Sequence, residues 1–376
     1  MVQEKHTRGR RSVPDGRKAA RHRRKKLGEH DRRHCNSRLG KRVLERFGRV
    51  LRGKKSSLIL THDNPDPDAL ASAAGMAFFY ESIANVPSRL AYGGIIGRAE
   101  NRALVRTLKL PVTPLGRLDL DEFDLLTLVD TQHPAGNHSL PEDRTPQVVI
   151  DHHPQRSGDH GVHLALVSDA YGATSSIVTE IIRFADLEPD PMLATALFYG
   201  VKSDTQSLVR RSTPADVEAY RWLFSRSDHA LLAEIEHPKV PLSYFQAYHT
   251  AYQHARIYGS VIMVDLGTVY TPDIVPEIAE RLLSLEQVNW SVAIGDYENE
   301  LYVSVRTNDR RRNAGRQIQS LTRDLGGSAG GHGSMAGAKI PLTERSSEEV
   351  ITLREKILSR FRGKLGVADE TESTLI

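Results

Sequence analysis

Histidine and aspartate are concentrated in one short segment, residues 61–69. Its sequence, Thr-His-Asp-Asn-Pro-Asp-Pro-Asp-Ala, offers His62, Asp63, Asp66 and Asp68 as nitrogen and oxygen ligands, and two prolines stiffen the turn. Unpaired carboxylates this close together repel one another, and a bound cation removes that conflict. The alternative is structural, because Asp68 directly precedes a predicted helix and aspartate is a common N-cap. The segment alone leaves both interpretations open.

Further aspartates and histidines follow two later apolar runs of strand length, residues 125–129 and 148–150. They are Asp130, Asp151, His152 and His153. In proteins built on an open parallel sheet, ligands bind beyond the carboxyl ends of the strands. We therefore expect these side chains to converge with the first cluster at one edge of one sheet.

Asp204, which follows a helical pattern at residues 191–202, adds another carboxylate to this set. The set offers oxygen and nitrogen donors and no thiolate, a chemistry that suits Mn²⁺ or Mg²⁺ better than cysteine-bound zinc. Carboxylates in this number can hold two divalent ions, and such ion pairs serve in phosphoryl-ester hydrolysis.

The elements that would carry these residues alternate between strand and helix. Strands are predicted at residues 57–60, 125–129 and 148–150, and helices at residues 38–52, 69–83, 174–184 and 191–202. This alternation predicts an α/β fold with a parallel sheet and helices on both of its faces. We expect this first domain to occupy residues 37–240.

A stretch with less pattern, residues 241–256, is expected to link the first domain to a smaller C-terminal α/β domain at residues 257–345. That domain should contain an apolar run at residues 257–264, helices at residues 272–283 and 314–325, and alternating strands at residues 288–296 and 300–306. Tyr297, Glu298 and Asn299 are the predicted hairpin turn. Residues 346–376 are expected to form a terminal helix and tail.

Residues 326–337 are unusually rich in glycine. Glycines let backbone N–H groups approach an anion closely. On composition alone a flexible surface loop is the simpler interpretation, and the absence of Gly-Lys-Ser/Thr excludes a Walker P-loop.

Taken in order, the acidic segments resemble the motifs of the DHH phosphoesterase family. The resemblance extends over about residues 55–345 and is to the branch with a C-terminal DHH-associated domain, the nanoRNase/pAp-phosphatase type. The four similar motifs are His62-x-Asn64-Pro65-Asp66-x-Asp68-Ala69, Val129-Asp130-Thr131, Asp151-His152-His153 and Ser203-Asp204.

The resemblance implies two metal sites that share one aspartate. One ion would be bound by His62, Asp66 and Asp130. The other would be bound by Asp68, Asp130, His152 and Asp204. The implied catalytic residues are His153, which would face the substrate phosphate, and Asp151, which would orient a histidine. The implied cofactors are two divalent cations, most simply Mn²⁺, with Mg²⁺ as the alternative.

In the C-terminal domain the resemblance implies a substrate-binding motif at Gly330, Gly331 and His332. Arg306 resembles the arginine with which that domain contacts phosphate, and a guanidinium can bind phosphate through two parallel hydrogen bonds. Arg98 is a further phosphate candidate, and a solvated helix start is the alternative for it.

Basic residues are concentrated at the start of the chain, although the net charge of all 376 residues is only +4. Residues 1–36 are polar and basic, so we expect a disordered arm that could contact RNA without reading its sequence or could be a nonessential extension. The single cysteine, Cys35, fits a reducing compartment. No apolar run reaches the ~20 residues that span a bilayer, so we expect a cytoplasmic protein without a membrane partner.

The predicted function is Mn²⁺-dependent hydrolysis of short oligoribonucleotides, and of pAp to AMP and phosphate. Expected partners are therefore short single strands or small nucleotides; the oligomeric state stays open, a dimer included. The enzymatic alternatives are a cyclic-dinucleotide or pApA phosphodiesterase and a RecJ-like single-strand exonuclease, and the C-terminal motif disfavours a family II pyrophosphatase. The alternative to all of these enzymes is a nucleic-acid-binding protein without catalytic activity.

Overall fold

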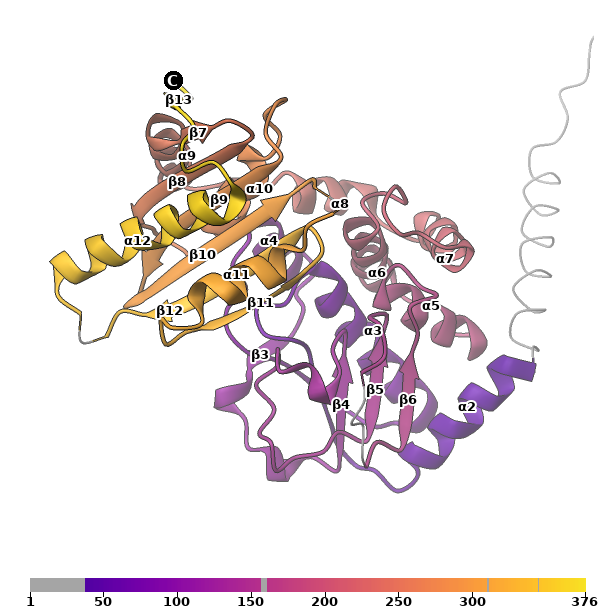
Figure 1. Cartoon of the computed structure of the whole chain (residues 1–376). Helices are drawn as coiled ribbons and strands as arrows, with labels where there is room; N and C mark the ends of the chain where they lie inside the picture. The colour runs from indigo at the N-terminus through magenta and orange to yellow at the C-terminus, as the bar shows by residue number, and fades with distance from the viewer. Residues whose placement is uncertain (1–37, 157–160, 310, 344) are drawn as a thin grey trace, which may run out of the picture. The chain divides into compact units, whose positions relative to one another are not determined.

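The computed structural model describes residues 38–156, 161–309, 311–343 and 345–376, which form two compact units (Figure 1). The first unit ends at His237, and the second begins at Pro238 and also includes Gly97–Ala99. The arm expected at residues 1–36, with its Cys35, lies outside the described residues. Across the described residues, no helix combines the length and the hydropathy needed to cross a bilayer.

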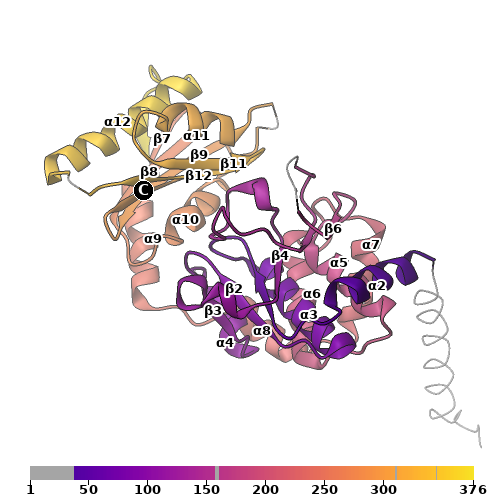
Figure 2. The same cartoon turned by 90° about the horizontal axis from the view of Figure 1, so that it is seen from below.

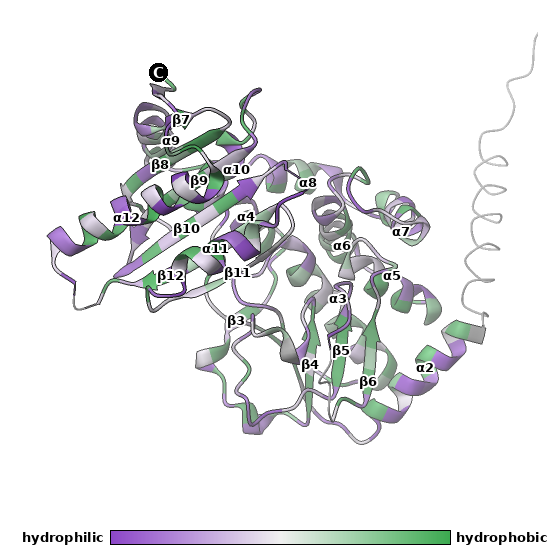
Figure 3. Cartoon of the chain, viewed as in Figure 1, coloured by the Kyte–Doolittle hydropathy of each residue, from purple (hydrophilic) through white to green (hydrophobic). Residues whose placement is uncertain are grey.

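The first unit is built on a six-stranded sheet in which every strand pairs in parallel with its neighbours, in the order β3-β2-β1-β4-β5-β6. The strands are β1 (Ser57–Leu60), β2 (Ser88–Tyr92), β3 (Val112–Pro114), β4 (Leu125–Val129), β5 (Val148–Asp151) and β6 (Leu164–Val167). β1, β4 and β5 are buried along their whole length, which explains why they read as continuous apolar runs. Figure 3 shows the hydrophobic character of β4, β5 and β6.

This strand order places a topological switch point between β1 and β4. From β1 the chain adds β2 and then β3 on one side, and it later adds β4, β5 and β6 on the other. Connections therefore leave the two central strands in opposite directions, and ligands of open α/β sheets bind in the resulting crevice. The acidic segments that follow β1 and β4 lie at this point.

Helices share one apolar cluster with one face of the sheet, packing either directly on the strands or on neighbouring helices. They are α2 (Arg38–Leu51), α3 (Pro67–Ala84), α4 (Ala99–Thr107), α5 (Thr174–Phe184), α6 (Pro191–Asp204), α7 (Pro214–Phe224) and α8 (His229–Glu236). The apolar cluster on the other face joins strand residues to two short 3₁₀ helices, η1 (Leu115–Arg117) and η2 (Leu120–Glu122), and to connecting segments. The predicted α/β fold with a parallel sheet is confirmed; its second face carries these short helices instead of long ones.

The second unit contains a seven-stranded mixed sheet in the order β11-β12-β10-β9-β8-β7-β13. Its strands are β7 (Arg256–Tyr258), β8 (Val261–Thr268), β9 (Trp290–Tyr297), β10 (Glu300–Thr307), β11 (Ser328–His332), β12 (Met335–Pro341) and β13 (Glu372–Thr374). Helices α11 (Ala314–Thr322) and α12 (Ser347–Leu365) cover one face, and α9 (Leu242–His254) and α10 (Ile274–Leu282) cover the other (Figure 2). Each face has its own apolar cluster, so this sheet is buried between two helical layers.

Two segments differ from their sequence-based expectation. The segment expected to link the domains is largely helical, because α9 places Ala251 and several tyrosines against the second sheet. The glycine-rich segment forms the antiparallel pair β11–β12 instead of a flexible loop. Glycine is needed in that pair, because a Cβ on Gly331 would lie 2.4 Å from the Cα of Ala336.

Candidate metal centre

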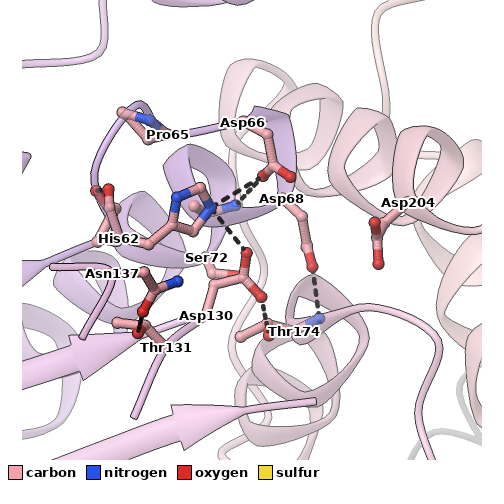
Figure 4. A network of polar contacts seen from close by, with 12 residues as sticks. His62, Pro65, Asp66, Asp68, Ser72, Asp130, Thr131, Asn137, Thr174 and Asp204 are labelled. Atoms are coloured by element: carbon pink, nitrogen blue, oxygen red, sulfur yellow. Dashed lines mark hydrogen bonds and ion pairs between the residues drawn. The ribbon is translucent and has the colours of Figure 1, made fainter. Parts of the chain in front are cut away.

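The turn after β1 delivers the first group of candidate ligands. Asp66 is the N-cap of α3, since its Oδ1 accepts a hydrogen bond from the backbone N of Ala69 at 3.0 Å and Pro67 follows it. The alternative interpretation of Asp68 as the cap is therefore wrong: Asp68 lies within the first helical turn, and its side chain is 1% exposed. Figure 4 shows the carboxylate of Asp66 directed at His62 and that of Asp68 directed at Thr174.

His62 presents one defined nitrogen to these carboxylates. Its Nδ1 lies 2.9 Å from the carbonyl oxygen of Asp63, which can only accept a hydrogen bond, so Nδ1 carries the proton. Nε2 then faces Asp130 Oδ2 at 3.5 Å and Asp66 Oδ1 at 3.9 Å. This arrangement, with one ring nitrogen anchored to the backbone and the other directed at carboxylates, is typical of metal-binding histidines.

Asp130 lies at the centre of the cluster, immediately after β4. Its side chain is 3% exposed, and its backbone adopts the left-handed conformation, with φ of 59°. Residues held in this conformation are concentrated at functional sites, because the surrounding structure must offset the strain. Asp130 Oδ1 lies 3.6 Å from His152 Nε2 and 3.9 Å from His153 Nδ1, so three imidazoles surround one carboxylate.

The segment at the start of α5 fixes two of the aspartates. Backbone N–H groups of Thr174 and Ser175 donate to the two oxygens of Asp68, at 2.7 and 2.8 Å. The Thr174 hydroxyl donates to Asp130 Oδ1 at 2.7 Å (Figure 4). We did not predict a role for Thr174 or Ser175, because neither is a typical ligand and only the fold brings them to the site.

Asp204, the last residue of α6, completes a further group. Its Oδ2 lies 3.3 Å from His152 Nε2. Candidate ligand atoms fall into three groups, and the atoms of each group lie within 4.8 Å of one another; one group shares Asp130 with another and His152 with the remaining one. The groups are His62–Asp66–Asp130, Asp68–His152–Asp204 and Asp130–His152–His153.

Burial and mutual repulsion make the negative charges of Asp68 and Asp204 unfavourable without a nearby cation. Burial, together with the charges of Asp130 and Asp204, raises the pKa of Asp68 well above its usual value. Burial, together with Asp66 and Asp130, raises the pKa of Asp204 to about 7. The hydrogen bond and charge of His62 outweigh burial at Asp66 and lower its pKa. Buried acids that raise one another's pKa, with only oxygen and nitrogen donors around them, fit divalent cations.

His153 differs from the other two histidines in its partner. Its Nδ1 lies 2.8 Å from Asp151 Oδ1, and the second oxygen of Asp151 accepts from Gln132 Nε2 at 2.6 Å. The hydrogen bond to Asp151, with the charges of Asp130 and Asp151, outweighs burial and raises the pKa of His153 to about 9. Gln132, which follows β4 by three residues, was not predicted; it fixes Asp151 and through it the ring of His153.

The second unit holds the remaining predicted residues. Arg306 Nη1 donates to Ser304 Oγ at 2.9 Å, and burial lowers the pKa of Arg306 to about 10. Arg306 of β10 and His332 of β11 both pair with Met335 of β12, the strand that lies between them, so they flank Met335 at one end of this sheet. Gly330 and Gly331 precede His332 in β11. Arg98, which clusters with this unit, forms an ion pair with Glu280 at 3.0 Å.

Two domain families match the chain. The model of the DHH family, N-terminal domain, matches residues 56–201, and the model of the DHHA1 domain matches residues 258–362. An uncharacterized protein of Methanocaldococcus jannaschii is 34% identical over 315 residues, which are 83% of this chain and 64% of that protein. A probable manganese-dependent inorganic pyrophosphatase of Staphylococcus aureus is 30% identical over 164 residues, 43% of this chain and 52% of that protein. The chain thus spans 64% and 52% of the length of these two relatives.

The fold has a counterpart among solved structures. The exopolyphosphatase-related protein from Bacteroides fragilis superimposes with a TM-score of 0.63 at 15% sequence identity. The match covers 86% of this chain and 97% of that one, so the two proteins share both α/β units.

Proposed function

Because the chain belongs to the DHH family, with a DHHA1 domain after its DHH domain, we propose that it is a phosphoester hydrolase dependent on divalent cations. DHH family members are hydrolases that act on phosphoester bonds. The observation that carries the proposal is Asp130, a buried carboxylate in a left-handed backbone position with imidazole nitrogens from His62, His152 and His153 around it. Such an arrangement at a switch point suits metal-assisted hydrolysis.

We assign two cations to this centre, Mn²⁺ in preference to Mg²⁺. His62, Asp66 and Asp130 would hold one ion; Asp68, Asp130, His152 and Asp204 would hold the other. The cations would supply Lewis acidity, which activates water and offsets negative charge on the phosphoryl group. The pyrophosphatase relative named as manganese-dependent supports the choice of metal.

The protein's own groups would orient the substrate around that centre. Asp151 holds His153 by its Nδ1, so Nε2 is the nitrogen left to donate to a phosphate oxygen. Arg306 and the glycine-rich strand would bind another phosphate or a nucleotide, with the N–H groups of Gly330 and Gly331 close to the anion. We therefore propose that the first unit carries the chemistry and the second binds substrate.

The proposed substrates are short oligoribonucleotides, and also pAp, from which AMP and phosphate would be released. A substrate-binding second unit with Arg306 and the motif Gly330-Gly331-His332 on strands at one end of its sheet suits a small nucleotide. We place this activity in the cytoplasm, in keeping with the single cysteine of the chain.

Inorganic pyrophosphate is the second candidate substrate. It is favoured by the pyrophosphatase relative, although that similarity covers only 43% of the chain. The motif Gly330-Gly331-His332, by its resemblance to a substrate-binding motif of the family, favours a nucleotide instead. Cyclic dinucleotides, pApA and longer single strands complete the set of alternatives.

One substrate panel tests the proposal. The full chain is supplied with Mn²⁺ and di- to pentaribonucleotides, pAp, pApA, cyclic dinucleotides, a long single strand and pyrophosphate, and products are separated by chromatography. We expect diribonucleotides to be cleaved fastest, and His152→Ala to abolish cleavage. His229→Ala, which changes an exposed histidine bonded to the carbonyl of Phe224, is the matched control. Preference for pyrophosphate, or full activity of His152→Ala, would contradict the proposal.

A further inference from the structure

Asp216 is a fully buried carboxylate that is not among the candidate ligands. It lies in the first turn of α7, where its Oδ2 accepts hydrogen bonds from the backbone N of Thr213 at 2.7 Å and from the Thr213 hydroxyl at 2.9 Å. Contacts of this kind close a helix N-terminus. The same oxygen also accepts from the backbone N of Gly172 at 2.8 Å, and Gly172 precedes it by 44 residues.

Helix capping does not by itself require this burial. Asp228 caps α8 by accepting from the backbone N of Ala230 and Leu231, and it does so while partly exposed to solvent. Burying a carboxylate costs free energy, and Asp216 Oδ1 is a buried atom without a hydrogen-bond partner among the described residues. The cost is offset only if Asp216 makes a contact that an exposed cap cannot make, and the bond to Gly172 is that contact.

Gly172 is enclosed on several sides. A Cβ at this position would lie 2.8 Å from the carbonyl oxygen of Arg211, 2.9 Å from Asp216 Oδ2 and 2.9 Å from Thr205 Cγ2. Thr205 directly follows the candidate ligand Asp204. Gly172 is therefore fixed between the end of α6 and the start of α7.

Two residues further along the chain, this same segment reaches the metal centre. Thr174 donates its hydroxyl to Asp130, and the backbone N–H groups of Thr174 and Ser175 donate to Asp68 (Figure 4). A displacement of Gly172 would move these donors, and with them the carboxylates that they orient.

We infer that Asp216 is a positioning residue: through Gly172 it fixes residues 172–175 against Thr205, so that Asp68, Asp130 and Asp204 keep the spacing that divalent cations require. The inference rests on the proposed function, since it presupposes that cations bind there. Groups outside the ligand set that orient the ligands typically change metal affinity 10- to 100-fold when they are removed.

The test measures Mn²⁺ binding to the full chain, from the electron paramagnetic resonance signal of free Mn²⁺. Asp216→Ala removes all three hydrogen bonds, and Gly172→Ala separates the same segments by steric contact without changing charge. We expect both to weaken Mn²⁺ binding by about tenfold or more. Asp216→Asn, which keeps an acceptor oxygen, should restore most of the affinity. Asp228→Ala, the control, removes the cap of α8 and should bind Mn²⁺ as tightly as the unaltered chain does.

Turnover of a diribonucleotide gives a second readout, because a general loss of stability would not be reversed by added Mn²⁺. For Gly172→Ala, added Mn²⁺ should restore kcat, because the defect lies in metal affinity. Unchanged Mn²⁺ affinity in Gly172→Ala, and in Asp216→Ala if it folds, would overturn the inference. A loss of Mn²⁺ affinity in Asp228→Ala as large as that in Asp216→Ala would also overturn the inference.

The outcomes separate this inference from the proposed function. If the unaltered chain binds Mn²⁺ but cleaves no phosphoester, the proposed function fails, while the binding comparison still decides the role of Asp216. If the unaltered chain binds no Mn²⁺, the metal centre and the inference fail together.

Discussion

His62 and Asp130 follow different strands, β1 and β4, and their side chains meet with His62 Nε2 3.5 Å from Asp130 Oδ2. β1 and β4 are neighbours in the sheet although 68 residues separate the two side chains. The contact therefore exists only because the parallel sheet places both strand ends at the switch point.

Asp130→Ala is expected to lower kcat for a diribonucleotide by about 10³-fold, since metal-derived charge stabilisation is worth several kcal/mol. Asp130 belongs to a ligand group with His62 and to another with His152, so its loss affects both. Initial rates at saturating Mn²⁺ measure the effect. Asp121→Asn, a change at an exposed carboxylate paired with Arg144, is the control and should retain full activity. Turnover by Asp130→Ala within tenfold of the unaltered rate would show that Asp130 is not a ligand.

Asp204→Asn should have opposite effects on stability with and without metal. The raised pKa of Asp204 means that its negative charge is unfavourable in the metal-free fold, so removing that charge should raise the Tm of the metal-free protein. Mn²⁺ bound at the proposed centre would stabilise the folded state by about 2.7 kcal/mol at a hundred times its Kd, and this gain should largely disappear in the variant. Calorimetry in EDTA and in Mn²⁺ checks both signs; a Tm lowered in EDTA would contradict the electrostatic argument.

Arg306→Ala is expected to raise KM for a nucleotide by about tenfold, because a charge-assisted hydrogen bond contributes 1.5–3 kcal/mol. Mn²⁺ binding should not change, because Arg306 lies in the second unit and the ligands lie in the first. Arg323→Ala, at an exposed arginine beside α11, provides the comparison. A loss of Mn²⁺ binding without a change in KM would assign Arg306 a different role.

Gly331→Ala is expected to destabilise the second unit by about 1–3 kcal/mol, the cost of a strained backbone position. The φ of Gly331 is 145°, and an added Cβ would lie 2.4 Å from the Cα of Ala336. The preceding glycine is the matched control, because a Cβ on Gly330 meets no atom within 4 Å. Denaturant unfolding compares the variants, and equal stability of the two would contradict the steric argument.

Deletion of residues 1–33 should weaken binding to RNA at low salt and leave diribonucleotide cleavage unchanged. The arginines and lysines of this segment would contribute counterion release, which depends on salt and not on base sequence. Binding measured at two salt concentrations tests the first part, and cleavage rates test the second. A truncated protein that loses both activities would show that the arm contributes to the catalytic unit.

The sequence alone determined the elements with strong patterns. The apolar runs that became β1, β4 and β5 are buried on both faces, so their composition was sufficient to identify them. The hairpin turn predicted at Tyr297, Glu298 and Asn299 is confirmed for the last two residues, which adopt positive φ, whereas Tyr297 ends β9 and pairs with Glu300. β2, β3 and β6 were not predicted, because they are short and only partly buried. Their place in the sheet follows from pairing of β2 with β1, of β3 with β2 and of β6 with β5, which is not a local property.

For the candidate site, the sequence supplied the ligand types and their positions after strands. The tertiary structure decided how they are held. Asp66 and not Asp68 caps α3, since the turn through Pro67 starts the helix two residues earlier than expected. Thr174, Gln132 and Asp216 belong to no sequence motif that predicts a site. Their roles follow only from the distant residues to which they are hydrogen-bonded. Those neighbours lie 19 to 106 residues away, and only the folded sheet brings them within hydrogen-bonding distance.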